Sequence, residues 1–384
     1  MATDISIAIP QKRIYRIAVS SFFFLAGLCF SSWASRIPDI QAKLHLNNAK
    51  LGAVLLSLPT GLLVSLPLSG WLVAKLGSKS IAIASALLYS ITLPALGFAQ
   101  TTGQLMLCLF IFGMGGNTMN ISINTQAVGT EALYERSIMA SYHGLWSLAG
   151  FSGAAIGTLL IRLGLLPWQH FLIITALALL IIIIAFRYLL AEDVNKNEHQ
   201  PIFVKPDRSI INLGLIAFCS MICEGAMFDW SGVYFQKVVQ PEKALVTMGF
   251  TAFMCTMATG RFVGDWVATR FGKKRTLQLS GILTATGLMI AVIFPFFITA
   301  VSGFLLVGAG VSSVIPLIYS SAGKSKLLSP GVAIAAVSTI GYLGFLFGPP
   351  FIGFIAQASS LRASLGLVAI LGSIIAVIAS RSKF

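Results

Sequence analysis

The stretch DWVATRFGKKR at residues 265–275 repeats, in weaker form, the stretch GWLVAKLGSKS at residues 70–80. The offset between the two is 195 positions, and it aligns three pairs: Trp71 with Trp266, Gly77 with Gly272, and Lys79 with Lys274. The same offset places Gly113 on Gly308 and Gly115 on Gly310. Two matches at one register indicate an internal duplication.

The composition is that of a membrane protein. Of the 384 residues, 57% are hydrophobic and only 10% are charged, whereas a soluble domain is about 25% charged. Apolar segments of about 20 residues are long enough to span a bilayer. Twelve are predicted, at 14–35, 49–72, 79–99, 103–127, 136–161, 167–188, 209–236, 245–268, 275–296, 298–320, 331–356 and 360–380. The predicted fold class is therefore an all-α membrane protein with twelve transmembrane helices in two pseudo-symmetric six-helix bundles.

One long polar stretch, AEDVNKNEHQPIFVKPDR at residues 191–208, separates the sixth span from the seventh. Its two prolines and mixed charges are typical of a linker. We predict an N-terminal six-helix bundle over 1–190, a cytoplasmic linker over 191–208 and a C-terminal six-helix bundle over 209–384.

The basic residues predict the orientation in the membrane. With the N-terminus inside, the cytoplasmic segments hold eighteen of the 26 lysines and arginines, the outer loops hold seven, and Arg261 lies within a span. This asymmetry follows the positive-inside rule, so the net charge of +14 does not require a nucleic-acid partner. We expect a multi-pass protein of a bacterial inner (plasma) membrane with both termini cytoplasmic, and a first span that is retained rather than cleaved as a signal peptide.

An enzyme or a metal protein is not favoured. The five cysteines lie in apolar runs without histidine neighbours. The sequence GFSG at 150–153 is similar to a rhomboid-type serine motif. However, His143 would lie about 13 Å from Ser152 along the helix, on the opposite face. No Walker motif or cofactor fingerprint occurs, so we expect no enzyme activity, no metal and no cofactor.

Five motifs resemble those of one transporter family. They are RFGKKR (270–275), KLGSKS (75–80), WASRIPDI (33–40), EGAMFDWSGVYF (224–235) and GYLGFLFGPPFIGF (341–354). Over essentially its whole length the chain resembles a major facilitator superfamily transporter, in the branch similar to fucose-permease-like bacterial carriers. The resemblance implies alternating access, with a solute site near the bilayer midplane between the two halves. We expect a monomer.

Three asparagines in the fourth span form one stripe. At 100° per residue Asn117, Asn120 and Asn124 lie at about 0°, 300° and 340° around the helix. Carboxamides are unfavourable against lipid tails, so this face lines a cavity or contacts another helix. We interpret it as cavity lining for a hydroxyl-rich solute, and hydrogen bonding between helices is the alternative.

Further solute-binding candidates lie on the fifth and tenth spans. In SYHGLWSLAG the side chains of His143 and Trp146 fall on one face, together with Ser147. The alternative interpretation is a helix end that is amphipathic at the cytoplasmic surface. Tyr319 shares a stripe with Ser312 and Pro316 that corresponds to the asparagines of the fourth span.

Two carboxylates lie within the apolar seventh span. A charge at the centre of a bilayer costs about 2.5–3.5 kcal/mol on insertion scales, so Glu224 and Asp229 require a function. Carboxyl groups in a cavity that is alternately dry and wet can take up and release protons. We predict that both groups couple transport to protons, and a structural hydrogen bond is the alternative.

Four charged residues are predicted to form gates. Arg261 and Asp265 stand at i, i+4 and are expected to pair at the cytoplasmic mouth, where Arg270 follows. Arg36 ends the first span at the outer face, where it is interpreted as an outer gate, with an anchor as the alternative. The spacings Gly260/Gly264 and Gly344/Gly348 indicate close helix packing, and Pro349-Pro350 predicts a break in the eleventh span.

The sequence leaves two transport directions open. Proton symport of a small, neutral, sugar-like solute fits the asparagine, histidine, tryptophan and carboxylate set. Proton-antiport efflux of an amphipathic or drug-like compound would also use buried carboxylates, with a more aromatic pocket.

Overall fold

The structure is a computed structural model and describes residues 9–134, 138–193, 208–323 and 330–382. The secondary structure of these residues is helical. The α-helices are α1 (Ile9–Ser35), α2 (Ile37–Lys43), α3 (Asn48–Leu55), α4 (Ser57–Leu76), α5 (Ser78–Phe98), α6 (Thr102–Glu131), α7 (Met139–Arg162), α8 (Pro167–Ala185), α9 (Arg208–Tyr234), α10 (Met248–Phe271), α11 (Lys273–Ile293), α12 (Phe297–Val311), α13 (Val314–Ala322), α14 (Pro330–Ala358) and α15 (Leu361–Arg381). Three short helical segments, η1 (Phe186–Tyr188), η2 (Phe235–Val239) and η3 (Lys243–Leu245), complete the order.

Within the described ranges, eleven helical segments are long and apolar enough to cross a membrane. The twelfth predicted span corresponds to α10, whose 24 residues extend about 36 Å. Its mean hydropathy is lowered because Arg261, Asp265 and Arg270 lie in its second half. Two spans are interrupted: α3 and α4 join at Leu56, and α12 and α13 join at Ser312–Ser313.

The predicted duplication is visible in the backbone. Gly77 and Gly272 occupy the same backbone conformation with positive φ, 82° in both, and ψ of 148° and 151°. Each glycine caps the end of one helix and the start of the next. A residue with a Cβ would be strained in this conformation. Gly113 packs on the carbonyl of Leu58, and Gly308 packs on the carbonyl of Phe253, which is the same contact displaced by 195 positions. The two halves therefore share helix packing as well as sequence.

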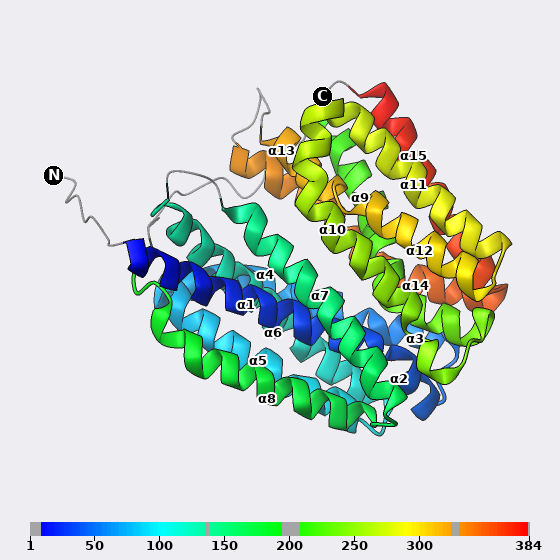
Figure 1. The fold of residues 1–384 in the computed structure, drawn as a ribbon, viewed down its shortest axis with the longest axis horizontal. Helices are drawn as coiled ribbons and strands as arrows, with labels where there is room; N and C mark the ends of the chain where they lie inside the picture. Colours follow the sequence, from blue (N-terminus) through cyan, green and yellow to red (C-terminus); the bar gives the residue numbers. More distant parts are fainter. Residues whose placement is uncertain (1–8, 135–137, 194–207, 324–329, 383–384) are drawn as a thin grey trace.

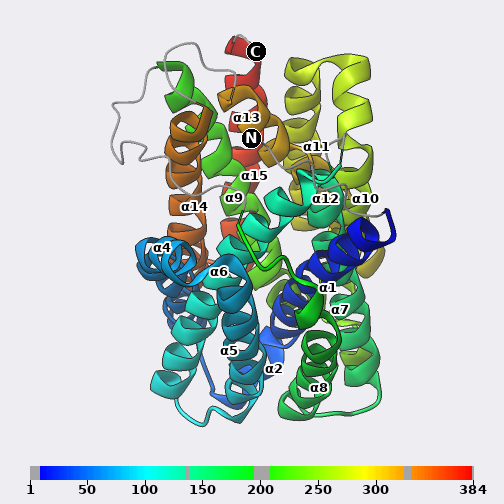
Figure 2. The same ribbon diagram turned by 90° about the vertical axis from the view of Figure 1, so that its left-hand side faces the viewer.

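The helices pack as two bundles (Figures 1 and 2). In the first, α1 packs on α7, and α6 packs on α4 and α5, while α8 covers α5. In the second, α9 packs on α14, and α11 packs on α12 and α15, while α10 packs on α12. This confirms the predicted fold class. Most of the predicted linker, residues 194–207, lies outside the described residues, so the proposed domain boundaries stay a prediction.

The bundles meet through α7 with α10 and through α3 with α14. We call the end that carries the segments 36–47, 163–166 and 240–247 the outer end, and the opposite end, where α1 begins and α15 ends, the inner end. At the outer end Gly52 of α3 lies against Gly353 of α14. Lys237 donates to Asn48 Oδ1 across the junction at 2.8 Å. The hydroxyls of Thr158 and Thr247 are 2.6 Å apart. These contacts join the bundles at the outer end.

The predicted break at Pro349-Pro350 is wrong. The helix α14 continues from Pro330 to Ala358 with both prolines inside it. A proline removes only one backbone donor, and neighbouring groups in a packed membrane helix can satisfy the freed carbonyl. The predicted close packing at Gly344 is present, because a Cβ there would lie 2.5 Å from the Phe218 carbonyl oxygen of α9.

Candidate functional site

A buried ion pair lies at the centre of the molecule. Arg261 of α10 donates to Glu224 Oε1 of α9 at 3.3 Å, and the two side chains are 18% and 7% exposed. Removing either charge from a buried pair leaves the other uncompensated, at a cost of about 3–5 kcal/mol. Each charge of the pair therefore stabilises the other in its buried position. Both residues belong to the second bundle.

Arg261 also connects the two bundles. Its Nη1 donates to Ser147 Oγ of α7 at 2.9 Å. Its guanidinium carbon lies 5.5 Å from the centroid of Trp146, in cation–π geometry. Such a contact contributes about 0.5–2 kcal/mol, depending on burial. One side chain thus contacts the carboxylate of one bundle and a hydroxyl and an indole ring of the other.

An aromatic cluster adjoins this ion pair. Phe228, one turn beyond Glu224 on α9, packs edge-on against Phe30 of α1, with ring centroids 5.0 Å apart. Trp146 lies 6.0 Å from Phe30 and 6.4 Å from Phe228. Phe253 of α10 and Phe345 of α14 enclose Phe228 from the second bundle. These rings form an apolar layer in which residues from both bundles interlock.

The three predicted asparagines do not share one environment. Asn117 is buried and donates to Ser65 Oγ of α4 at 2.8 Å, so it joins two helices of the first bundle. Asn120 is exposed, and Asn124 is half-buried and donates to the Asn120 carbonyl oxygen at 2.7 Å. Gly113, on the same stripe, packs on α4, whereas Gly115 and Gly116 pack on Tyr89 of α5. The predicted stripe therefore combines one contact between helices, made by Asn117, with two residues whose described hydrogen bonds stay within α6.

His143 and Trp146 lie on the face of α7 that borders the junction. The His143 ring is exposed and meets Phe23 of α1 edge-on at 5.4 Å. It also lies within electrostatic range of Arg261. The structure brings His143, Trp146 and Ser147 together with Arg261, which the helical spacing alone did not indicate.

Asp229 is separate from the ion pair. Its side chain is half-buried, and no hydrogen bond to it is found among the described residues. It shares a stripe of α9 with Gly225, which packs on Phe345, and with Gly232, which packs on Pro38 of α2. Asp229 thus lies between the aromatic cluster and the outer end, on a face turned toward α2 of the first bundle.

Arg36, a predicted gate, is 2% exposed. It donates to Asp39 Oδ2 at 2.8 Å and through Nε to His170 Nδ1 of α8 at 3.1 Å. The contact with His170 could not be predicted from local spacing, because 134 positions separate the two residues.

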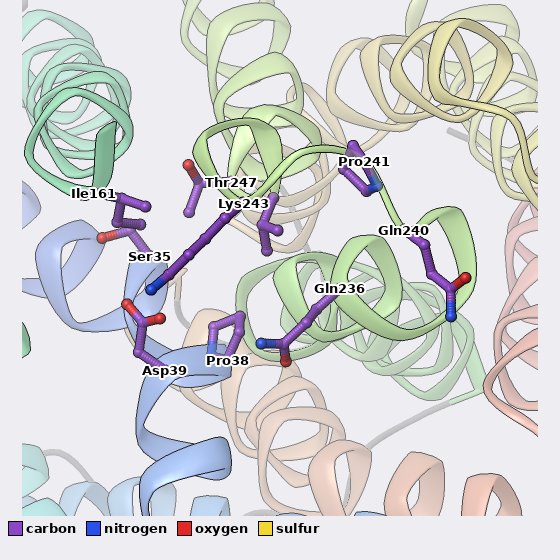
Figure 3. A pocket seen from close by; sticks show the side chains of 10 residues that line it. Ser35, Pro38, Asp39, Ile161, Gln236, Gln240, Pro241, Lys243 and Thr247 are labelled. Carbon is purple, nitrogen blue, oxygen red and sulfur yellow. The ribbon is translucent and has the colours of Figure 1, made fainter. Parts of the chain in front are cut away.

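Asp39 also borders a cavity of about 340 Å³ at the outer end. Residues from both bundles line it: Ser35, Pro38, Asp39, Ile161, Gln236, Gln240, Pro241, Lys243, Val246 and Thr247. Figure 3 shows the Lys243 ammonium group pointing across this cavity toward Asp39 and Ser35. The cavity was not predicted, since its residues come from three separate segments of the chain, 35–39, 161 and 236–247, that the fold alone brings together.

The remaining predicted residues lie toward the inner end. Arg270 is exposed at the end of α10. Tyr319 of α13 is half-buried and lies within electrostatic range of Glu224, as does Tyr342 of α14. The side chain of Asp265 lies outside the described residues, so its pairing with Arg261 stays a prediction. The partner found for Arg261 is Glu224. Among the described residues, no group of three or more His, Cys, Asp or Glu is placed to hold a metal ion.

Comparisons with known proteins agree with this architecture. A solved structure of a bacterial homolog to the human lysosomal transporter Spinster, in an inward-facing and unoccupied conformation, superimposes with a TM-score of 0.76. It covers 98% of both chains at 16% sequence identity, which supports the fold alone. An MFS-type transporter of Yersinia pestis is 33% identical over 94% of this chain and 93% of its own. Membrane protein MosC of Rhizobium meliloti is 32% identical over 96% of this chain and 90% of its own.

The profile of the Major Facilitator Superfamily matches residues 19–326 and 244–382, which together include all of the membrane-spanning helices except the first residues of α1. With the duplicated bundles and the polar centre between them, this match shows that the chain is a membrane-embedded transporter of the Major Facilitator Superfamily.

Proposed function

We propose that this protein moves a small, polar, hydroxyl-bearing solute across the plasma membrane by alternating access, coupled to protons. The observation that carries the proposal is the Glu224–Arg261 pair, because it links a titratable group to the contact between the bundles. Asn120, Asn124, His143 and Trp146 are the proposed solute contacts.

The coupling step follows from the charges. When Glu224 is ionised, it shares Arg261 with Ser147 and Trp146. When Glu224 takes up a proton, its attraction for the guanidinium is lost, and Arg261 is free to bind solute or to change its contact with the first bundle. A proton would thus alter the energy difference between two arrangements of the bundles. Asp229 is proposed as a second proton site nearer the outer end.

The arrangement described here is joined at the outer end, and we propose that it corresponds to an inward-facing state. This assignment assumes the orientation expected from the positive-inside rule, with both termini in the cytoplasm. We retain the domain boundaries 1–190, 191–208 and 209–384 and a monomeric state as parts of the proposal. The sequence favours symport of a neutral, sugar-like solute, since amide groups and an indole face suit hydroxyls and sugar rings.

The test uses proteoliposomes that contain a trapped pH-sensitive dye. Glucose, xylose, fucose or myo-inositol added outside should acidify the interior if solute and protons enter together. The Glu224→Gln variant should lose this acidification and keep solute binding, measured as a rise in unfolding temperature. Glu242→Gln, at an exposed loop carboxylate, is the matched control and should behave like the parent protein. Unchanged acidification in Glu224→Gln would exclude Glu224 from coupling.

The aromatic cluster favours a second candidate, proton-antiport efflux. Phe30, Trp146 and Phe228 offer stacking surfaces for an amphipathic compound. The same liposomes distinguish the two functions. Ethidium placed inside should leave in exchange for protons if the protein exports drugs, and the sugars should then have no effect.

A further inference from the structure

A small cavity of about 20 Å³ lies beside Arg261, where α10 meets the bend between α12 and α13. Six residues line it: Arg261, Gly264, Ser312, Ser313, Pro316 and Leu317. A cavity that holds one water needs roughly 10–15 Å³. The space therefore admits one oxygen-sized group next to a guanidinium.

The internal repeat explains why this space exists. In the first bundle the corresponding positions are filled: Asn117 donates to Ser65 at 2.8 Å, and the hydroxyls of Ser69 and Thr118 are 2.7 Å apart. A shift of 195 positions replaces Ser65, Ser69, Asn117 and Thr118 by Gly260, Gly264, Ser312 and Ser313. Gly264 removes the side chain that would fill this cavity, whereas at Gly260 the space of a side chain is taken by Ser312.

The hydroxyls on the other side of this gap have therefore lost their partners across it. Ser312 Oγ donates to the Ala309 carbonyl of its own helix at 2.8 Å. Among the described contacts, Ser313 Oγ has no hydrogen bond. Ser313 Oγ can therefore donate to a group in the cavity, whereas Ser312 Oγ, whose proton goes to Ala309, can accept a hydrogen bond.

The repeat also places a charge at this point, because Arg261 occupies the position of Leu66. In the described contacts, Arg261 donates one hydrogen bond through Nη1 to Ser147 and one through Nη2 to Glu224. Its Nε is buried without a partner. A guanidinium has five donors and prefers two parallel bonds to an oxyanion. Its contact with Glu224 is a single bond of 3.3 Å, which leaves capacity for a second oxyanion.

We infer that this cavity receives one oxygen of a carboxylate, so that the transported solute is a hydroxylated monocarboxylic acid whose carboxylate binds against Arg261 and Ser313. The inference rests on the proposed function and alters one part of it, the charge of the solute. The nine-residue helix α13 begins at Val314, beside the cavity. Its N-terminal end adds a favourable field for a negative group.

The charge balance connects this subsite to Glu224. Among the described side chains, Arg261 with ionised Glu224 is neutral, so a solute carboxylate entering beside them would bring one excess negative charge into a buried site. A proton taken from water by Glu224 restores neutrality, and solute and proton then bind together. Among the described side chains, the other titratable groups near Glu224 are Tyr319 of α13 and Tyr342 of α14, and His143 of α7 lies near Arg261. Asp265, whose side chain lies outside the described residues, is one turn from Arg261 on α10.

The experiment compares acids with their neutral counterparts on the full-length protein in lipid nanodiscs. The probes are gluconate with sorbitol, glucuronate with glucose, and lactate with propane-1,2-diol. Binding is measured as the concentration that gives half of the maximal rise in unfolding temperature. At least one acid should bind about tenfold more tightly than its neutral counterpart, since hydrogen bonds to charged groups are the stronger class.

Three variants identify the subsite. Gly264→Ser introduces the side chain that the first bundle has at Ser69. At position 264 even a Cβ would lie 2.6 Å from Ser313 Oγ. The variant should therefore fill the cavity and weaken acid binding about tenfold. Ser313→Ala should weaken acid binding about threefold to tenfold and leave neutral probes unaffected. Thr118→Ala, the same change at the symmetry-related position, is the control and should bind the acids like the parent protein.

The outcomes separate this inference from the proposed function. If neutral probes bind as tightly as the acids, or if Gly264→Ser and Ser313→Ala bind acids like the parent, the carboxylate subsite is refuted and the proposed function stands. If neither acids nor neutral probes bind, and ethidium export is seen in liposomes, both are refuted.

Discussion

Replacing Gly52 with alanine should weaken the junction that closes the outer end. Gly52 of α3 lies against α14, and an alanine Cβ there would be 2.7 Å from the Pro349 carbonyl oxygen and 3.1 Å from Gly353 Cα. Both partners are backbone atoms, so no side chain can rotate to relieve the contact. The helices must separate by a few tenths of an ångström, or the bundles must open at this end.

The size of the effect follows from this contact. Inserting a methyl group into well-packed surroundings costs about 1–3 kcal/mol. Because 1.4 kcal/mol changes an equilibrium tenfold, the closed arrangement should lose about 5- to 150-fold relative to one in which the outer ends are apart. That shift is enough to reverse the populations of two states that differ by a few kcal/mol. Gly70→Ala is the matched control, because a Cβ at Gly70 of α4 meets nothing within 4 Å.

The assay is a distance measurement between nitroxide labels at Lys50 and Ser359, which are both exposed at the outer end. Cys108 and Cys255, the two partly exposed native cysteines, are first replaced by alanine. Gly52→Ala should add a population at longer distance, and Gly70→Ala should match the parent protein. If the Gly52→Ala distribution coincides with that of the parent, the contact does not control closure.

The central ion pair and its neighbours support three further predictions. Arg261→Gln should lower the unfolding temperature more than Glu224→Gln/Arg261→Gln does, since the single change leaves a buried carboxylate unpaired, at a cost of about 3–5 kcal/mol. The reverse order of unfolding temperatures in a fluorescence melt would contradict the pairing. Asn117→Ala should cost about 0.5–1.5 kcal/mol by removing the bond to Ser65 and should leave solute affinity unchanged, whereas lost affinity would place Asn117 in the solute site. Trp146→Phe should keep more of the solute affinity than Trp146→Ala, because a phenyl ring preserves part of the stacking and cation–π contact; equal losses in a binding titration would argue against a stacking role.

Several features could be predicted because they depend on local spacing. Apolar segments of bilayer length locate the helices, and the constant offset between Gly77 and Gly272 revealed a duplication that the backbone repeats. Helical periodicity also placed Asn117, Asn120 and Asn124 on one stripe of α6. Periodicity does not say what faces that stripe, and Asn117 proved to contact Ser65 of α4.

The sequence by itself therefore determined the membrane-spanning class, the duplicated plan and the residues that share a helix face. The tertiary structure decided which faces meet. It brought Glu224 to Arg261 across 37 positions and Arg36 to His170 across 134. It also placed Gly264 opposite Ser313, where the first bundle has a hydrogen-bonded pair of side chains. The physical reason is that a helix's own hydrogen bonds fix its internal geometry, whereas its rotation and depth against a neighbour depend on the packing of all the helices together.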